Sequence, residues 1–462
     1  LQDPAIDFHQ LLFIDVPYPQ GGEWPHEALH HLGKRAASGG RLLLLDGLHP
    51  GGNVQRLVTD RTGAFLRPDL SFDAQRIVFC FKPDADKSYH LYEINIDGSG
   101  LRQLTFGHYD DISPAYLPDG KILFCTTRCN SYVRCGPYIE STVLARCDAD
   151  GHNIYLLSAG NEPDYTPTLL ADGRVLYTRW EYTDKEQIRV QSLWTVNPDG
   201  SGVSVYWGNQ SYWPDILFEA RPIPGSHRVI FSGVGHHDIF SGSIGIIDRN
   251  QGLNYPHGLT KVTPDVPWGE VGDGPAEQRE SDQYHTSGDY TAYRSPYPLS
   301  DRLFLVSARR GTKHTHIASD RDAGCFKLYL MDLQGHRELI YEGMYNVLYA
   351  MPVQPRARPP LIPDRVAWPG RERDGQPVAP GVLFSGDVYA GLPEVPRGSV
   401  KFLRVIQQDS TTFSLGCKAQ QPGDTQTQPQ MLGGPPLSLT VVDGIKRILG
   451  SVPVEADGSV CL

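Results

Sequence analysis

The chain has 462 residues, and its 42 Lys and Arg against 53 Asp and Glu give a formal net charge of −11, so neither nucleic acid nor an anionic membrane has an electrostatic reason to bind it. Its 48 glycines and 37 prolines recur in short turn signals along the whole length, which excludes a helical bundle. No apolar run approaches the roughly 20 residues of a membrane-spanning helix.

The first sixty residues predict strands at 7–14, 41–45 and 54–59, where apolar residues are concentrated. The opening residues, Leu1 to Pro4, show neither the basic nor the apolar stretch of a secretory leader. From the residues alone, two locations stay open: the cytoplasm, or export with a leader already removed.

A sequence repeat begins near residue 67. Each copy has a proline, a short apolar stretch, an Asp-Gly or Asp-Ala turn and an apolar strand, at 67–79, 113–124 and 166–177, with weaker copies near Arg221 and Ser295. A second hairpin follows, with Asp-Gly at 97–98, 150–151 and 199–200. Asp-Gly between apolar runs indicates a hairpin because its type I′ turn needs two residues at positive φ.

Four strands in a unit of roughly 45 residues are typical of a β-propeller blade. The blades are predicted at 67–105, 113–158, 166–207, 219–262 and 295–341, with one more built from the N-terminal strands. The predicted fold is therefore all-β: a six-bladed propeller over residues 1–345, with seven blades as the alternative.

The two faces of such a propeller differ. In an up-and-down blade, the turns between strands one and two and between strands three and four lie on one face, so the Asp-Gly turns mark that face. The segments after each second strand gather on the opposite face, where we expect binding residues. Candidate metal ligands there are Cys129, Cys135, His236 and His237. The other candidate binding residues are Arg128, Arg179, Glu181, Tyr182, Asp238, His314 and His316.

Simpler interpretations of these residues stay open. The spacing of Cys125, Cys129 and Cys135 is not that of a zinc ribbon, and a local disulfide, buried thiols or histidines bonded to backbone carbonyls would also explain the residues. Arg179 and Glu181 are more typical of a buried ion pair between neighbouring blades than of a substrate contact. No catalytic residue is predicted, because hydrolase, P-loop and dinucleotide motifs are all missing.

The pattern changes near residue 345. The stretch 352–363 is rich in proline and predicts an ordered strap or linker rather than a strand. Strands are predicted at 381–389, 399–406 and 445–454, and a loop at 416–437. Residues 346–462 are therefore expected to form a smaller β-rich domain.

The blade repeat resembles the TolB-type propeller repeat, and the whole chain resembles the hydrazine synthase alpha subunit family. The stretches that carry the second resemblance are 116–120, 177–182, 387–392, 397–404 and 448–458. The resemblance implies a propeller followed by a middle domain with a c-type haem, protein partner subunits and an exported (periplasmic or extracellular) location. It also implies a zinc ion near the haem, for which Cys135 is the nearest candidate ligand.

One departure from the family decides the functional prediction. Covalent haem attachment needs Cys-x-x-Cys-His, and the sequence contains no such motif. The family condenses nitric oxide and ammonium at haem iron, so we expect this chain to be a non-catalytic scaffold, and a fragment that ends before the haem motif.

The alternative function is a binding module that recognises a protein or glycan through its loop face. Aromatic residues of the stretch 261–294, namely Trp268, Tyr284, Tyr290 and Tyr293, would suit it if they are exposed. A hydrolase with an unfamiliar site is a third, weaker hypothesis.

Overall fold

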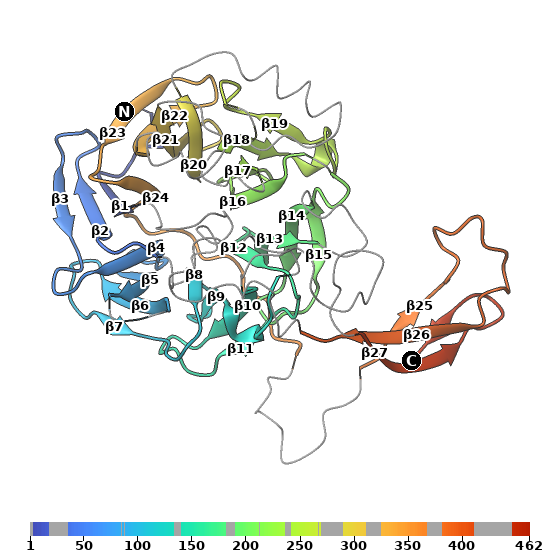
Figure 1. The fold of residues 1–462 in the computed structure, drawn as a ribbon. Coiled ribbons are helices and arrows are strands. Elements are labelled where there is room, and N and C mark those ends of the chain that lie inside the picture. Colours follow the sequence, from blue (N-terminus) through green and yellow to red (C-terminus); the bar gives the residue numbers. More distant parts are fainter. Residues whose placement is uncertain are drawn as a thin grey trace, which may run out of the picture.

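The structure is a computed structural model. It describes residues 3–17, 36–84, 86, 88–133, 140–181, 190–211, 213–235, 242–266, 268, 290–310, 325–366, 381–410 and 446–462. Its strands up to Pro352 form antiparallel sheets arranged around a common centre (Figure 1). Within these residues, the helices are two 3₁₀ turns, η2 (Thr127–Cys129) and η3 (Arg249–Gln251), and no helix is long and apolar enough to cross a membrane. The predicted all-β propeller class is confirmed.

Three sheets contain four strands each, paired in chain order. The first is β4 (Gly63–Leu70), β5 (Arg76–Pro83), β6 (His90–Asn95) and β7 (Arg102–Gln103). The second is β8 (Asp111–Tyr116), β9 (Ile122–Thr126), β10 (Val143–Cys147) and β11 (Tyr155–Leu156). The third is β20 (Tyr290–Pro298), β21 (Leu303–Arg310), β22 (Lys327–Asp332) and β23 (Arg337–Tyr341).

A larger sheet joins two further four-stranded units. One is β12 (Asp164–Leu169), β13 (Val175–Trp180), β14 (Gln191–Val196) and β15 (Ser204–Trp207). The other is β16 (Ile216–Pro222), β17 (Val229–Val234), β18 (Gly242–Ile247) and β19 (Leu259–Lys261). The two units are linked by one residue pair, Gln191 with Ile216. The number of blades, six with seven as the alternative, stays a prediction because the structure describes only part of the chain.

The remaining sheet brings the two ends of the propeller together. It consists of β24 (Asn346–Pro352), β1 (Gln10–Val16), β2 (Arg41–Asp46) and β3 (Asn53–Arg56), in that order. All seven residues of β24 are buried, and the strand pairs antiparallel with β1. The pairing thus carries the first sheet through Pro352, past the expected boundary at 345/346; the division into domains itself stays a prediction.

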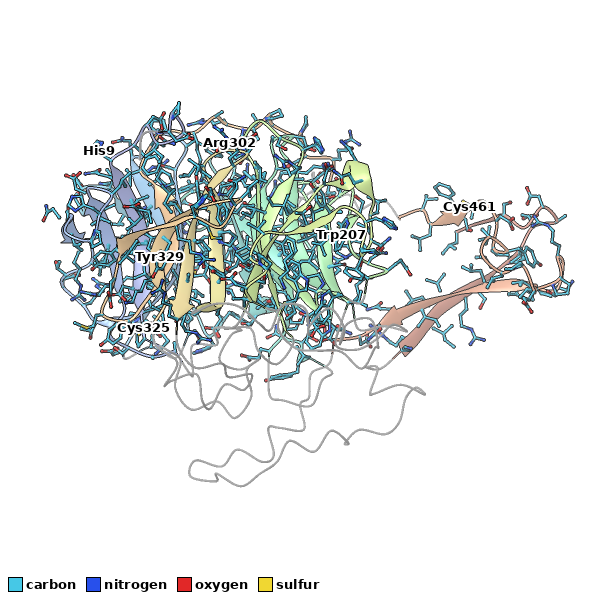
Figure 2. The ribbon with its side chains drawn as sticks, turned by 90° about the horizontal axis from the view of Figure 1, so that it is seen from above. His9, Trp207, Arg302, Cys325, Tyr329 and Cys461 are labelled. Atoms are coloured by element: carbon cyan, nitrogen blue, oxygen red, sulfur yellow. The ribbon has the colours of Figure 1, made fainter. Side chains whose placement is uncertain are left out.

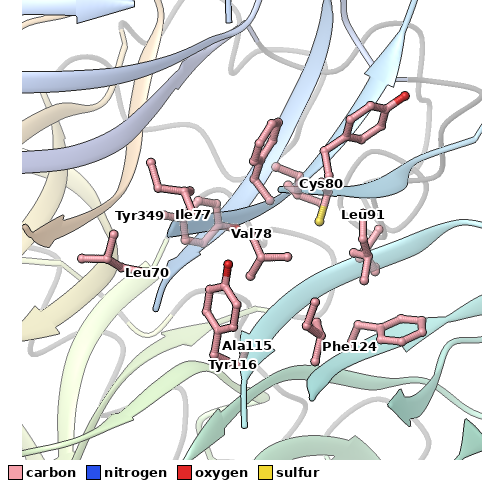
Figure 3. Packing of buried hydrophobic residues seen from close by; sticks show 14 of the residues in the cluster. Leu70, Ile77, Val78, Cys80, Leu91, Ala115, Tyr116, Phe124 and Tyr349 are labelled. Atoms are coloured by element: carbon pink, nitrogen blue, oxygen red, sulfur yellow. The ribbon is translucent and has the colours of Figure 1, made fainter. Parts of the chain in front are cut away.

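The core lies between neighbouring sheets. Apolar side chains from β4, β5, β6, β8 and β9 interlock there, as the packing around Val78, Tyr116 and Phe124 shows (Figure 3). The thiol of Cys80 lies in the same cluster, and burial raises its pKa. It therefore packs as a small apolar group.

The predicted difference between the two faces follows from the antiparallel order of the strands. Glycines at the repeated turns have positive φ, for example 88° at Gly98 and 89° at Gly120. Figure 2 shows Arg302, in the turn between β20 and β21, at one rim, and Cys325, directly before β22, at the opposite rim. We call the first rim the turn face and the second the loop face.

The innermost strands share a β-bulge. The pairing register shifts in each of β4, β8, β12, β16, β20 and β24. The shift lies next to one residue, which in several of these strands is followed by proline. In five of them that residue has positive φ, between 42° and 58°: Ser113, Thr166, Glu219, Ser295 and Tyr349. Arg67 takes the equivalent place in β4, before Pro68. Bulges re-aim side chains and are common next to functional sites.

A strap of residues 353–366 crosses the turn face after β24. Its Arg356 amide donates to the Phe72 carbonyl, and its Arg356 guanidinium contacts both carboxylate oxygens of Asp69 at 2.8 Å. Further along, Asp364 accepts from both terminal nitrogens of Arg146, at 2.9 and 2.6 Å. The proline-rich segment is thus an ordered strap tied to two sheets, as expected.

Beyond residue 380 the chain forms two small sheets. One is β25 (Phe384–Ser385) with β28 (Val460–Cys461), and the other is β26 (Phe402–Gln408) with β27 (Lys446–Pro453). The paired β26 and β27 extend away from the ring of sheets (Figure 1). We call β26 and β27 the arm.

Candidate functional site

Of the four predicted metal ligands, the structure describes Cys129. It lies in η2 at the loop face, and its Sγ donates to the Ser141 carbonyl at 3.2 Å. Burial raises the pKa of this thiol to about 11. Cys135, His236 and His237 lie outside the described residues, and among the described residues no three His, Cys, Asp or Glu side chains group as a metal site.

Arg128 stabilises the loop face rather than projecting from it. Its guanidinium donates to Asp111 at 2.6 Å and lies 4.8 Å from the ring centre of Tyr109. Asp111 is fully buried, and burial raises its pKa to about 6 in spite of the facing guanidinium. This pair joins the turn after β9 to the start of β8.

Arg179 forms an ion pair, as the simpler interpretation expected, but the pair lies within one sheet. Its Nε is 3.2 Å from Asp164 Oδ1 in the adjacent strand, β12. The guanidinium also covers the ring of Trp194, at 4.9 Å from the ring centre. Glu181 follows β13 and accepts a 3.5 Å bond from Ser192. Tyr182, Asp238, His314 and His316 lie outside the described residues.

Two of the four aromatic residues expected to be exposed, Trp268 and Tyr293, are buried. Trp268 is 1% exposed and Tyr293 is fully buried. Each belongs to a buried apolar cluster. Glycines on β17 and β18 leave room for the indole of Trp268. Of the other two, Tyr284 lies outside the described residues, as does the side chain of Tyr290. The binding-surface argument for Trp268 and Tyr293 is therefore wrong.

A buried polar network lies at the bulges of the innermost strands. Glu219 is 2% exposed; its carboxylate accepts from Arg294 Nη2 at 2.8 Å and from the Ser295 amide at 2.6 Å. Burial raises the pKa of Glu219, but the Arg294 guanidinium and the Ser295 amide outweigh it, so the net pKa is lowered. Glu219 is therefore ionised and connects β16 with β20 across a blade boundary.

A pocket lined by described residues lies near this network, where the innermost strands reach the turn face. Its volume is about 240 Å³. Residues of β4, β8, β12, β16 and β20 line it, and the strap closes one side with Arg356, Ala357 and Pro359. Because these strands come from five units, the pocket exists only once the sheets have assembled.

Arg221 lines this pocket together with Arg356, which is paired with Asp69, and Arg67 lies near Arg221. Among the described residues no carboxylate forms an ion pair with Arg221, and none does so with Arg67. Neither arginine was among the predicted site residues, which were expected on the loop face. The sequence did contain a signal for them. Arg67 and Arg221 each lie in or beside the repeated bulge of an innermost strand, where side chains face the axis of the propeller.

Comparisons with solved structures show the same fold. Kuenenia stuttgartiensis hydrazine synthase superimposes with a TM-score of 0.67 at 19% identity, over 98% of this chain and 64% of that chain. TolB from Acinetobacter baumannii gives a TM-score of 0.47 at 13% identity, over 74% of this chain and 66% of that one. No protein-family model and no curated protein matches the sequence. At 19% identity the similarity to hydrazine synthase shows the fold alone, and this chain spans 64% of the hydrazine synthase chain.

Proposed function

We propose that this chain is a non-catalytic binding scaffold, in which the propeller is the rigid body and the arm docks a protein partner subunit. The observation that carries the proposal is the exposed apolar surface of the arm. Phe402 is 66% exposed, Ile406 50%, Ile448 61% and Leu449 60%. Ile406 and Ile448 lie directly opposite each other in the strand register.

The arm consists of two strands, which alone cannot bury these apolar side chains. An isolated two-stranded sheet is marginally stable in water, and contiguous exposed apolar residues mark interaction sites. Near the arm, Val382, Leu383 and Phe384 are also exposed, Phe384 by 79%. An apolar protein surface would cover these side chains and leave the charged ends of the arm, such as Arg447, in water.

The similarity to hydrazine synthase suggests the kind of assembly: a propeller scaffold of an exported complex. A covalently bound haem does not fit the residues present. The 462 residues contain no Cys-x-x-Cys-His. We therefore derive no redox step for this chain.

Zinc at Cys129 and Cys135 stays part of the proposal. The Cys135→Ala variant should lose zinc in metal analysis of the purified protein, because a thiolate ligand is removed. The matched control is Cys461→Ala, which removes an exposed thiol from β28. Equal zinc content in the wild type, Cys135→Ala and Cys461→Ala would reject the zinc site.

The arm is tested with a pair of cross-strand substitutions. The tagged full-length chain, expressed in its source organism, should co-purify with a partner protein in a fixed ratio, and Ile406→Ser with Ile448→Ser should reduce that partner at least tenfold. The control replaces the next polar pair in register, Gln407→Ser with Arg447→Ser, and should retain it. Native mass spectrometry gives the ratio. A wild-type chain that purifies alone, or a partner retained by the isoleucine variant, would contradict the proposal.

A further inference from the structure

The pocket at the turn face has the size and lining of a small-molecule site. Its volume is about 240 Å³, and apolar side chains such as Leu169, Ile223 and Tyr297 form much of its wall. Charged groups reach it from separate elements: Arg221 from β16, Asp69 from β4 and Arg356 from the strap. The hydroxyl of Tyr116, which also lines the pocket, donates to Glu93. Pockets with an apolar wall and a few convergent polar groups are typical ligand sites.

Arg221 is a cation of this pocket without an ion pair to any carboxylate of the described residues, although Asp69 in the same lining acts on it from beyond ion-pair distance. Its guanidinium lies over the ring of Tyr297, 4.9 Å from the ring centre. Burial and the nearby Arg67 lower its pKa to about 10. Arg356 differs from Arg221, because its charge is neutralised by the ion pair with Asp69.

Arg67 adds a second positive charge beside Arg221. It is 3% exposed, and among the described residues its Nη1 has no hydrogen-bond partner. A buried guanidinium with an unsatisfied donor is costly, and a second guanidinium beside it adds repulsion. Glu219, the nearby carboxylate, is already engaged by Arg294 and Ser295. The ion pairs of the described residues therefore leave excess positive charge beside the pocket.

We infer that this pocket binds a small organic carboxylate, whose acid group is held by Arg221 and whose apolar part rests against Leu169, Ile223 and Tyr297. The planar guanidinium presents two parallel donors that match the two oxygens of a carboxylate. The apolar wall disfavours a fully hydrated inorganic anion, and the volume limits the ligand to a small molecule. This site is separate from the arm, so it goes beyond the proposed scaffold function.

The test uses thermal unfolding of the full chain with three probes. Benzoate has both a carboxylate and an apolar ring, benzyl alcohol lacks the charge, and inorganic phosphate lacks the apolar part. We expect benzoate to raise the unfolding midpoint saturably by roughly 2–4 °C, as a ligand of the native state does. Benzyl alcohol and phosphate should produce no saturable shift. A saturable shift with phosphate and none with benzoate would overturn the carboxylate assignment.

The Arg221→Gln variant locates the effect. It should abolish the benzoate shift and, without ligand, unfold at the wild-type midpoint or higher, because the repulsion from Arg67 is relieved. The matched control is Arg358→Gln, which removes the same charge from an exposed position on the strap outside the pocket lining and should keep the shift. An undiminished benzoate shift in Arg221→Gln, or a ligand-free midpoint several degrees below wild type, would overturn the inference.

Discussion

The Glu219→Gln variant is expected to lose about 3–5 kcal/mol of unfolding free energy, the range measured when one partner of a buried ion pair is removed. The carboxylate accepts bonds from Arg294, Ser295 and Ser232, and an amide at this position presents an NH₂ group to donors. The ion pair with Arg294, whose side chain is 2% exposed, would also be lost. Denaturant titration measures the loss.

The pH dependence of this loss has a definite sign. The pKa of Glu219 is lowered in the folded state, so its stabilisation is present above its ordinary value of 4.5 and disappears as the pH falls through the folded-state pKa. The difference between wild type and variant should therefore shrink in acid. Glu338→Gln, an exposed carboxylate on β23, is the control and should change stability by less than about 0.5 kcal/mol. Equal effects of the two substitutions would contradict the structural role of Glu219.

The Trp268→Ala variant is expected to lose a similar amount, about 3–5 kcal/mol, because it removes a large buried side chain and leaves a cavity. The indole stacks on Phe231 with the ring centres 5.8 Å apart and the planes at 9°. The Lys261 Nζ lies 4.6 Å from the indole ring centre, and this cation–π contact would also be lost. Denaturant titration of the variant against wild type checks the expected loss.

A double-mutant cycle gives the sharper form of this prediction. A Cβ added at Gly233 would come within 2.2 Å of Trp268 Cε3, so Gly233→Ala should destabilise the wild-type chain. In the Trp268→Ala background the clash is gone, and the same substitution should cost at least 1 kcal/mol less. Additive effects would mean that the indole does not occupy the space above Gly233.

Much of the fold could be predicted from the sequence because its signals are local. Each Asp-Gly turn fixes a hairpin by itself, and antiparallel order then decides which face the turn lies on. The closing strand β24 could not be predicted in this way. Its partner β1 lies near the N-terminus, far away in the sequence, and the prolines after Pro352 made the segment resemble a linker.

The pocket was missed for a different reason. Its lining comes from five strands and the strap, with residues far apart in the sequence such as Tyr116, Arg221 and Arg356. The repeat marks only the turns, so no local pattern brings these residues together. Trp268 was misjudged because its surroundings in the sequence are polar, while its packing partners are glycines on distant strands.

Hydrogen–deuterium exchange shows whether β24 closes the ring of sheets on β1 and so assembles the pocket at the turn face. If it does, the amides of 347–351 exchange as slowly as those of 11–15, and at least about 100-fold more slowly than those of 402–408 in the exposed arm. Exchange of 347–351 at the rate of the arm would contradict closure of the ring and, with it, assembly of the pocket.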